Sequence, residues 1–366
     1  METSTTEDPE KCIPLCLQKL FCQLQFRDVA CSTKTLTKSF GWTDMDSIMQ
    51  HDVQEFCRVL IDNLEMKMKG TELENSIPKL FKGRTRSYIR CINVNYESSK
   101  IEEFYDLSML VKGCKNLQES FEKYIEKEKM DGDNQYNTEE FGKQDAEMGV
   151  EFIEFPSVLH LHLRRFEYDY ETGMMIKIND RFEFPEEIDL SPYLAKDAKE
   201  GNSNANKSNI YDLYGVLVHF GSYESGHYYA FLRTSTDPQW YKFDDCCVTK
   251  EIPKMAIQDN FGGSIYPNYT SKVQNSPLGG YAGYAYQYAR MKRYSGYMLV
   301  YVRRDDADRI FMPISENEIP GHLIDYVQQV EREAKMKKEQ QIEESNTLNI
   351  NIISQNDLEN WSLQGN

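Results

Sequence analysis

One histidine and two aspartates flank a pair of short aromatic segments between residues 227 and 245. His227 opens the segment HYYAFLR, and Asp244 and Asp245 close the segment WYKFDD. An imidazole beside a carboxylate is the orienting half of a nucleophile–histidine–aspartate system, because the carboxylate fixes the tautomer and stabilises the imidazolium. The pattern therefore predicts a general base, His227, that is oriented by Asp244.

The spacing of these segments predicts how the two side chains meet. Both segments alternate like strands, and TSTD (234–237) is typical of a four-residue hairpin loop. This pairing places Phe231 opposite Trp240 and His227 opposite Asp244. Directly opposed side chains share one face of a sheet, with Cβ atoms roughly 5 Å apart.

The neighbours of this pair leave alternatives open. Gly226 precedes the histidine and lets the backbone turn or approach a substrate closely. The second acid, Asp245, points to the other face or caps the end of its strand. A histidine and an aspartate at a hairpin mouth also form purely structural hydrogen bonds, which is the alternative to a catalytic pair.

The remaining histidines do not predict a metal site. His160 and His162 share one face of a strand, but no third ligand comes with them. The sequence also has no CxxC pair of the kind that structural zinc sites use. We therefore expect neither a metal nor a cofactor.

The sequence around the pair predicts helices in the first part of the chain and strands after them. Apolar residues recur at helical spacing in 12–26 and in 47–69, the second helix opening with a capping box at Ser47 and stopping at Gly70. Strand-like segments follow, with one helix around 116–129 among them. Helices followed by strands predict an α+β fold with an antiparallel-rich sheet.

Charge and composition exclude several classes of protein. The 366 residues include 42 Lys and Arg against 59 Asp and Glu, a net charge of −17. Such a surface repels nucleic acids and anionic membranes, and it favours a basic partner or simply solubility. No window holds roughly 18 uninterrupted apolar residues, and the N-terminus lacks the basic and apolar regions of a signal peptide. We expect a cytoplasmic or nuclear protein whose nine cysteines are reduced.

Insertions and a tail complete the organisation. Residues 195–208 have the composition of a flexible loop, and residues 262–296 are rich in Gly and Tyr. Residues 318–344 predict a charged, solvated helix that spaces two domains. TLNINIIS then alternates like the first strand of a new module, and the chain ends before that module is complete.

Further motifs recur in a fixed order. They are QHDVQEF (50–56), LHLHLRRFEYD (159–169), INDRFEFPEEIDL (178–190), LYGVLVHFGSYESGHYYAFL (213–232), WYKFDD (240–245) and GYMLVYVR (296–303). The set resembles the catalytic domain of ubiquitin-specific proteases, above all the herpesvirus-associated subfamily and its fungal relatives. The resemblance covers about residues 12–303.

The resemblance implies a papain-like cysteine protease fold of thumb, palm and fingers, with the N-terminal part of the thumb absent. Residues 1–78 would be the remaining thumb helices, and residues 79–303 the palm and fingers. Residues 304–346 would be a charged helical linker, and residues 347–366 the truncated start of a ubiquitin-like module.

The resemblance also assigns roles to single residues. His227 matches the family's general base, Asp244 its orienting acid, and Asp245 a second acid near the oxyanion site. Seven positions match the channel for the C-terminal tail of ubiquitin: Asp52, Gln54, Arg165, Phe166, Tyr168, His219 and Tyr228. That tail is basic before its two glycines, so Asp52 and the acidic balance suit it. Ubiquitin and ubiquitinated proteins are the implied partners.

One departure from the family concerns the nucleophile. The family places it in a GxxNxGxTCYxNS-type box ahead of these motifs, and this sequence has no such box. None of its nine cysteines stands clearly at a helix N-terminus, where the dipole lowers a thiol pKa. Cys246 and Cys247 follow the acid pair, on the wrong side of His227 for attack.

We therefore predict a deubiquitinating isopeptidase domain that is inactive as written, in a chain that is a fragment of a longer protein. A natural pseudoenzyme that binds ubiquitin without cleaving it is the alternative. A β-rich structural protein, with His227 and Asp244 joined by a core hydrogen bond, is a third possibility.

Overall fold

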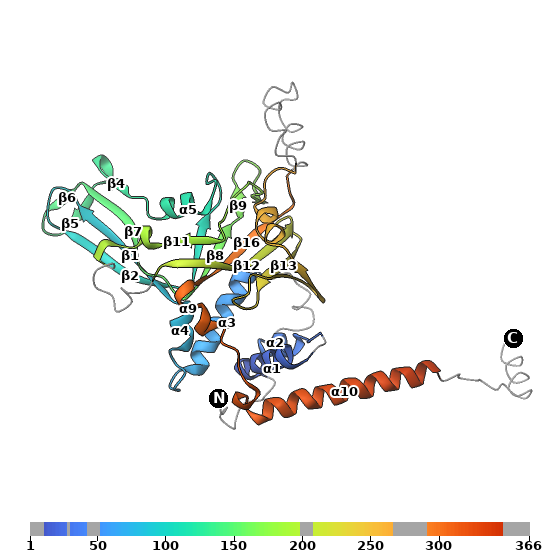
Figure 1. Ribbon diagram of the computed structural model, residues 1–366. Coiled ribbons are helices and arrows are strands. Elements are labelled where there is room, and N and C mark those ends of the chain that lie inside the picture. The colour runs from blue at the N-terminus through green and yellow to red at the C-terminus, as the bar shows by residue number, and fades with distance from the viewer. Residues whose placement is uncertain (1–10, 28–29, 42–51, 198–207, 266–290, 347–366) are drawn as a thin grey trace, which may run out of the picture. The chain divides into compact units, whose positions relative to one another are not determined.

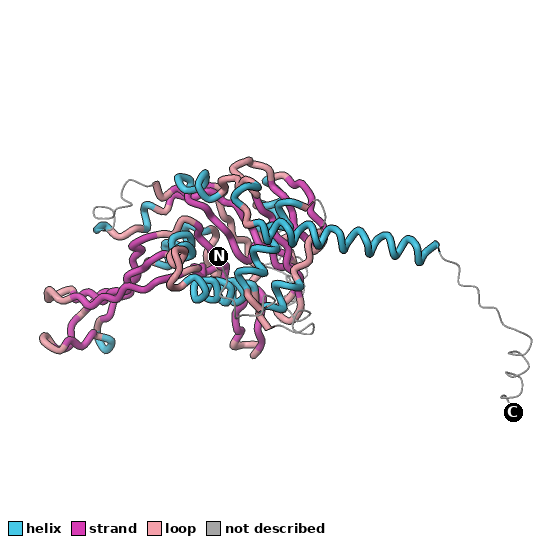
Figure 2. The backbone as a smooth tube through the Cα atoms, turned by 90° about the horizontal axis from the view of Figure 1, so that it is seen from below, coloured by secondary structure: helices cyan, strands magenta, loops and turns pink. Residues whose placement is uncertain are grey.

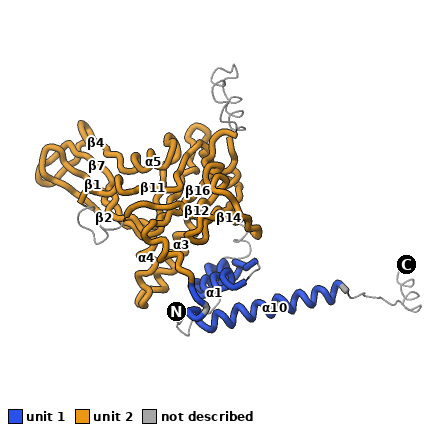
Figure 3. The backbone as a smooth tube through the Cα atoms, viewed as in Figure 1, with its two compact units in different colours: residues 1–42, 314–366 blue, residues 43–313 orange. Residues whose placement is uncertain are grey.

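The computed structural model describes residues 11–27, 30–41, 52–197, 208–265 and 291–346. The chain divides into two compact units, residues 1–42 with 314–366, and residues 43–313 (Figure 3). The Ser47 capping box, most of both insertions and TLNINIIS lie outside the described residues. Within the described residues, no helix is long and apolar enough to cross a membrane.

The first unit is built from helices. Its elements are α1 (Ile13–Phe26), α2 (Lys34–Ser39), η5 (Glu316–Glu318) and α10 (Gly321–Asn346). Helix α1 packs on the start of α10, where Leu323 and Val327 are buried against Cys22. The prediction of a helix after residue 318 is confirmed, but its first turns are packed rather than solvated. Residues 331–345 are exposed, as their charge predicts.

The second unit begins with two helices and continues as a β-rich body with short helices between the strands (Figure 1). The helical elements are α3 (Val53–Met68), α4 (Ser76–Phe81), α5 (Leu117–Tyr124), η1 (Gly132–Asn134), η2 (Ser191–Tyr193), α7 (Pro253–Ala256), η3 (Gln258–Asn260) and α9 (Arg304–Ile310).

The largest sheet has eight strands and carries the predicted pair. Its strands follow the order β15-β14-β13-β12-β16-β8-β3, and β11 pairs with the start of β12. The bounds are β3 (Asp106–Leu110), β8 (Val158–Arg164), β11 (Glu187–Asp189), β12 (Ile210–Gly221), β13 (Gly226–Arg233), β14 (Trp240–Asp244), β15 (Cys247–Glu251) and β16 (Tyr294–Arg303). Among its described ladders only β3–β8 is parallel, so the antiparallel-rich sheet is confirmed.

A second sheet and two hairpins extend this body. The sheet has the order β2-β1-β7-β4, and Figure 2 shows its long strands running out from the rest of the unit. The bounds are β1 (Gly83–Cys91), β2 (Glu97–Phe104), β4 (Glu128–Met130) and β7 (Ala146–Glu154), with hairpins β5 (Tyr136–Thr138)–β6 (Gly142–Gln144) and β9 (Phe166–Asp169)–β10 (Met174–Lys177). The helix expected over 116–129 ends at Tyr124, because residues 128–130 join this sheet as β4.

The core lies under the large sheet. Alternate residues of β8, β12 and β16 are fully buried, among them Leu161, Val216 and Leu299. Phe121 of α5 and Phe152 of β7 pack into the same cluster, which ties the second sheet to the first. Since burying one such side chain contributes about 1.5–3 kcal/mol, this cluster holds the strands that carry the site in fixed register.

Candidate active site

Helix α3 positions the first predicted site residue. Asp52 is its N-cap in an extended conformation, and its Oδ1 accepts a hydrogen bond from the Gln54 backbone N–H at 2.7 Å. A capping carboxylate satisfies one of the unpaired N–H groups at a helix start and interacts well with the dipole. The helix predicted from Ser47 therefore begins six residues later, at Val53, while Gly70, with φ of 76°, ends it as predicted.

Tyr297 on β16 links that helix start to the large sheet. Its hydroxyl donates to Asp52 Oδ2 at 2.7 Å, and its ring is fully buried. Burial first, and then the bond to Asp52, raise the pKa of the Tyr297 hydroxyl, so it remains a donor throughout the physiological range. The two residues are 245 positions apart in sequence, so this contact fixes α3 against the sheet.

An aromatic cluster surrounds this hydrogen bond. Its members are Phe166, His219, Tyr228 and Tyr297, with ring centroids 4.8 to 6.3 Å apart in the contacting pairs. Tyr297 therefore connects Asp52 to three other predicted tail-channel residues, because it binds the carboxylate and contacts their rings. Tyr297 was not among the predicted site residues, although it belongs to the motif GYMLVYVR, because its partner could not be read from that motif.

His219 is the titratable centre of this cluster. It is 4% exposed, and burial together with the nearby Lys177 ammonium lowers its pKa to about 4. Neutral imidazole is thus the resting form at pH 7. Gly226 packs directly against it, since a Cβ on that glycine would lie 2.1 Å from His219 Nε2. The glycine is required for this close approach rather than for a left-handed turn.

Arg165 does not line the site, which corrects its predicted role. Its side chain is 0% exposed, and its guanidinium donates to four backbone carbonyls, those of Gly296 (2.7 Å), Ile178 (3.0 Å), Asp180 (3.0 Å) and Phe261 (3.3 Å). A buried cation persists only when its donors are satisfied in this way. Arg165 therefore positions the strands behind the cluster and has no surface to offer a ligand.

Lys177 is a second buried cation, and it was not among the predicted site residues. Its Nζ donates to the carbonyl oxygens of His219 at 2.8 Å and of Arg293 at 3.0 Å. Burial first, and then the charges of Arg165 and Arg293, lower its pKa to about 7. This lysine fixes the backbone beneath His219.

The side chains of Gln54 and Tyr168 make their contacts with residues outside the cluster. The Gln54 side-chain amide donates to Asp106 Oδ2, a carboxylate that Arg58 also binds at 2.8 and 3.0 Å. Tyr168 lies on the hairpin of β9 and β10, 45% exposed, with its ring against Tyr170.

His227 and Asp244 form the predicted pair. His227 Nε2 lies 2.6 Å from Asp244 Oδ1, with side-chain exposures of 41% and 29%. The second carboxylate oxygen accepts a hydrogen bond from Lys242 Nζ at 2.6 Å. Lys242 first, and His227 second, lower the pKa of Asp244. An ionised Asp244 accepts a hydrogen bond from Nε2–H, which leaves the lone pair on Nδ1, the nitrogen that can take a proton from a nucleophile.

The strand register that produces this pair differs from the predicted one. Phe231 pairs with Lys242, and Arg233 pairs with Trp240, so the loop spans 234–239 rather than four residues. His227 therefore meets Asp244 diagonally instead of directly opposite. The face was still predicted correctly, because a shift of two residues keeps every side chain on its own side of the sheet.

Asp245 joins the pair instead of pointing to the other face. It is the only described residue other than glycine with a positive φ, 50°, and it opens the two-residue turn from β14 to β15. One carboxylate oxygen of each aspartate and one ring nitrogen of His227 all lie within 4.8 Å of one another. Two carboxylates thus face one imidazole.

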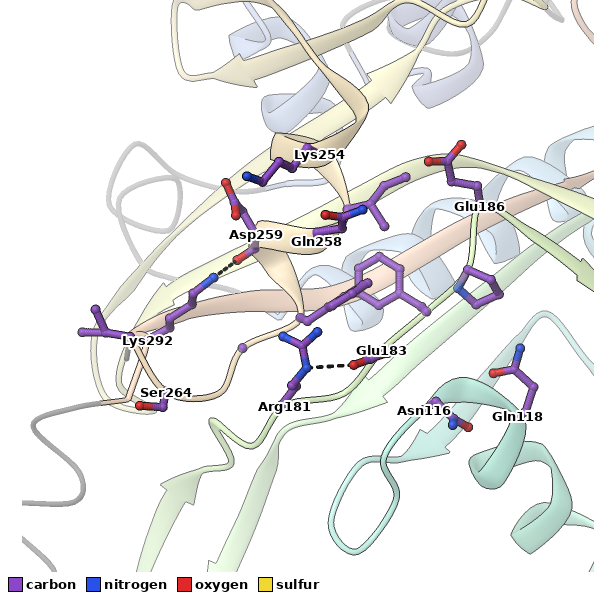
Figure 4. A pocket seen from close by; sticks show the side chains of 16 residues that line it. Asn116, Gln118, Arg181, Glu183, Glu186, Lys254, Gln258, Asp259, Ser264 and Lys292 are labelled. Carbon is purple, nitrogen blue, oxygen red and sulfur yellow. Dashed lines mark hydrogen bonds and ion pairs between the residues drawn. The ribbon is translucent and has the colours of Figure 1, made fainter. Parts of the chain in front are cut away.

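An open cavity of about 960 Å³ lies elsewhere in this unit (Figure 4). Lys292 and Arg181 line it, with Lys292 donating to the Asp259 carbonyl at 2.9 Å and Arg181 paired with Glu183 at 2.8 Å. None of the predicted site residues lines this cavity. It is therefore separate from the histidine–aspartate site.

Known proteins are similar to this chain in sequence. The family model described as ubiquitin carboxyl-terminal hydrolase matches residues 1–301. "Ubiquitin carboxyl-terminal hydrolase 15" of Saccharomyces cerevisiae is 44% identical over 355 residues, covering 95% of this chain and 28% of that protein. "Ubiquitin C-terminal hydrolase 13" of Arabidopsis thaliana is 47% identical over 347 residues, covering 94% and 29%. "Ubiquitin carboxyl-terminal hydrolase 7" of Drosophila melanogaster is 42% identical over 355 residues, covering 96% and 29%. The chain spans less than a third of the length of these relatives.

A solved structure shares the fold. A chain from the SAGA Ubp8/Sgf11/Sus1/Sgf73 DUB module bound to ubiquitin aldehyde superposes with a TM-score of 0.61 and 25% identity, covering 82% of this chain and 61% of that chain. The α+β, papain-like fold is thereby confirmed. The family model covers nearly the whole large sheet and both predicted acids. This chain therefore belongs to the ubiquitin carboxyl-terminal hydrolase family.

Proposed function

We propose that this chain is part of a ubiquitin-specific protease domain that hydrolyses isopeptide bonds at the C-terminus of ubiquitin. The observation that carries the proposal is the 2.6 Å contact between His227 Nε2 and Asp244 Oδ1. In this reaction a thiol loses its proton to His227 Nδ1 and attacks the carbonyl carbon of the last glycine. His227 then returns that proton to the leaving amine, while Asp244 stabilises the imidazolium, and water hydrolyses the thioester that remains.

We further propose that none of the nine cysteines supplies the thiol, so the chain as written does not turn over substrate. Five of them are buried, and the exposed Cys246 and Cys247 follow the strand that carries Asp244. Loss of a nucleophile costs on the order of 10⁶-fold in turnover. The test is release of a fluorophore from the C-terminal amide of ubiquitin. Turnover by this chain that a Cys247→Ser or Cys246→Ser change abolishes would overturn this part of the proposal.

Binding without cleavage is the second candidate function for this chain, because the residues that would hold a substrate are present. The half-buried Asp52 carboxylate and the aromatic rings around Tyr297 offer negative charge beside apolar surface. A basic tail ending in small glycines suits such a channel. The SAGA module that shares the fold was solved bound to ubiquitin aldehyde, which supports ubiquitin as the partner. The nine free cysteines support a cytoplasmic or nuclear location.

A charge-only change tests the channel. Asp52→Asn keeps an N-cap residue on α3 and an acceptor for Tyr297, and it removes the negative charge. We expect its affinity for ubiquitin to fall about tenfold, equivalent to about 1.4 kcal/mol, in a fluorescence titration. Asp62→Asn, on an exposed face of the same helix, is the matched control. Ubiquitin lacking its C-terminal tail should bind weakly to the wild type and to both variants. Equal affinity of the wild type for tailless and intact ubiquitin would refute the tail channel.

A further inference from the structure

The histidine–aspartate pair shares its face of the large sheet with a tyrosine and a lysine. Tyr229 lies two residues after His227 on β13, and Lys242 lies two residues before Asp244 on β14. Side chains two residues apart along a strand point the same way, and the register sets Lys242 opposite Phe231, so all of these side chains lie on one face. The proposed reaction uses only the histidine and the aspartate, and it leaves the other two polar residues without a function.

The charged end of Lys242 has two contacts. Its Nζ lies 2.6 Å from Asp244 Oδ2 and 4.4 Å from the centroid of the Tyr229 ring. An ammonium within about 6 Å of a ring centroid is attracted to the face of the ring by its quadrupole. A surface lysine loses rotamer freedom when it enters an ion pair, and many such pairs contribute little for that reason. The ring gives this lysine a second contact that favours the same position.

Tyr229 is in turn held by the core. Its ring meets that of Phe231 edge to face, with centroids 5.8 Å apart and planes at 73°. Phe231 is 4% exposed and belongs to the main core cluster, against which Tyr229 packs. In the other direction along the strand lies the imidazole of His227, with its centroid 6.2 Å from that of the tyrosine. The tyrosine ring therefore connects the rigid core to the charged residues.

The two carboxylate oxygens of Asp244 have different partners. Oδ1 lies 2.6 Å from His227 Nε2, and Oδ2 accepts a hydrogen bond from Lys242. A carboxylate with one partner can rotate and exchange its oxygens, whereas a carboxylate held at both oxygens keeps its plane. Asp245 brings a second carboxylate to within 4.8 Å of this pair, and like charges at such a distance repel. The Lys242 ammonium offsets this repulsion.

We propose that Tyr229 and Lys242 are positioning residues for the general base. The ring holds the ammonium, the ammonium holds Oδ2 of Asp244, and Oδ1 is then directed at His227 Nε2. Because that contact sets the orientation of the imidazole, it also sets where Nδ1 meets the proton of a thiol. The role in catalysis rests on the function proposed above, whereas the arrangement of the four side chains can be tested without ubiquitin.

Removing the ring tests the first step. Lys242 is the first cause of the lowered pKa of Asp244, so a lysine that loses its contact with the ring in Tyr229→Leu should let that pKa rise toward its ordinary value. A carbon NMR titration of the full chain measures the rise. Tyr229→Phe keeps the ring and should keep the wild-type pKa of Asp244.

A double variant shows whether the ring acts through the lysine. Tyr229→Leu/Lys242→Met should raise the pKa of Asp244 no further than Lys242→Met alone, because the ring has no effect once the ammonium is gone. Tyr241→Leu, on the opposite face of β14, removes a ring of the same size and should leave Asp244 unchanged. An Asp244 pKa that stays at the wild-type value in Tyr229→Leu, or a larger rise in the double variant than in Lys242→Met, would overturn the proposal.

Nitrogen NMR of the His227 ring reports the orientation of the base itself. We expect the proton on Nε2 in the wild type and a larger share of the Nδ1–H tautomer in Tyr229→Leu. Tyr229→Met is a second variant without the ring, so the result does not depend on how one substitution packs. A proton on Nε2 in the wild type, with Asp244 and the tautomer unchanged in both variants, would overturn only this inference. A wild-type ring without a proton on Nε2 would overturn the proposed function as well.

Discussion

Strand β13 separates two environments that use the same side-chain types for opposite purposes. On one face His227 meets Asp244 and Lys242, all partly exposed, in a charged network with water access. On the other face Tyr228 packs against the buried His219 and Tyr297, with tilted rings whose centroids lie 4.8 and 5.5 Å from that of Tyr228. Each face therefore has one histidine, and only the surroundings differ.

The difference shows how a fold divides proton transfer from positioning. In the buried cluster, desolvation holds His219 neutral with its pKa near 4 and raises the pKa of Tyr228 to about 12, so neither changes charge near pH 7. On the exposed face, Lys242 and His227 keep Asp244 ionised. We infer that the buried face fixes geometry and the exposed face exchanges protons.

The largest expected effect comes from replacing Arg165, the buried cation behind the aromatic cluster. Arg165→Met removes a guanidinium that satisfies four backbone carbonyls and leaves those acceptors without partners in the core. We expect a loss of about 3–5 kcal/mol in the free energy of unfolding. Urea denaturation measures it, and Arg164→Met, at the exposed neighbouring position, should change stability by less than about 0.5 kcal/mol. Equal losses in both variants would show that Arg165 is not a structural cation.

The second largest effect concerns the close contact between Gly226 and His219. Gly226→Ala would place a Cβ 2.1 Å from His219 Nε2 and 2.6 Å from the Phe220 carbonyl oxygen. Either the ring or the strand must shift, at an expected cost of about 2–3 kcal/mol in unfolding free energy. Gly321→Ala, where a Cβ has nothing within 4 Å, is the control. If both alanines are tolerated equally in thermal unfolding, the close approach at Gly226 does not constrain the site.

The exposed face was the easier one to predict from sequence. Strand alternation alone puts His227 and the acid on one side, and this survives an error of two residues in register because the side-chain period is two. The predicted loop length was wrong. Trp240 pairs with Arg233 rather than with Phe231, so the loop is two residues longer than the turn-like residues 234–237 indicate.

The buried face could not be predicted in the same way. Arginine is almost never fully buried unless its donors are satisfied. The resemblance to the family placed Arg165 in the tail channel, and no local pattern showed that it is buried. Its four acceptors come from β16, from residues 178–180 and from Phe261, segments that only the folded chain brings together. Tyr297 and Asp52 form a comparable long-range pair. Local pattern thus predicts strand faces, whereas the partners of buried polar groups depend on the complete fold.

A pH titration sharpens the comparison. The His219 pKa is about 4 in the folded state against an ordinary histidine value of 6.5, so between these two values the unfolded chain binds the extra proton. The free energy of unfolding therefore rises from pH 4 to pH 6.5. Below pH 4 the full loss of stability from the lowered His219 pKa is present. His219→Gln should remove about 2 kcal/mol of this rise after allowance for solvent screening.

Packing loss must be distinguished from proton linkage in that experiment. Phe166→Leu removes a ring that contacts His219 but adds and removes no titratable group. This variant should be less stable at every pH and keep the wild-type slope. His160, whose pKa burial also lowers to about 4, should keep part of the slope in every variant. An unchanged slope in His219→Gln would mean that His219 is protonated in the folded chain at pH 5.

The smallest effect concerns the exposed pair. Lys242→Met removes the first of the two hydrogen-bond partners that lower the pKa of Asp244, so that pKa should rise toward its ordinary value in a carbon NMR titration. Because an aspartate with a lowered pKa stabilises the fold only while it is ionised, the variant should lose stability above about pH 4, by about 0.5 kcal/mol or less, and match the wild type in acid. Lys250→Met, on exposed β15, should leave Asp244 unchanged. A pKa that does not move would show that water and His227 alone keep Asp244 ionised, and the exposed face would then depend even less on fixed partners than the buried one.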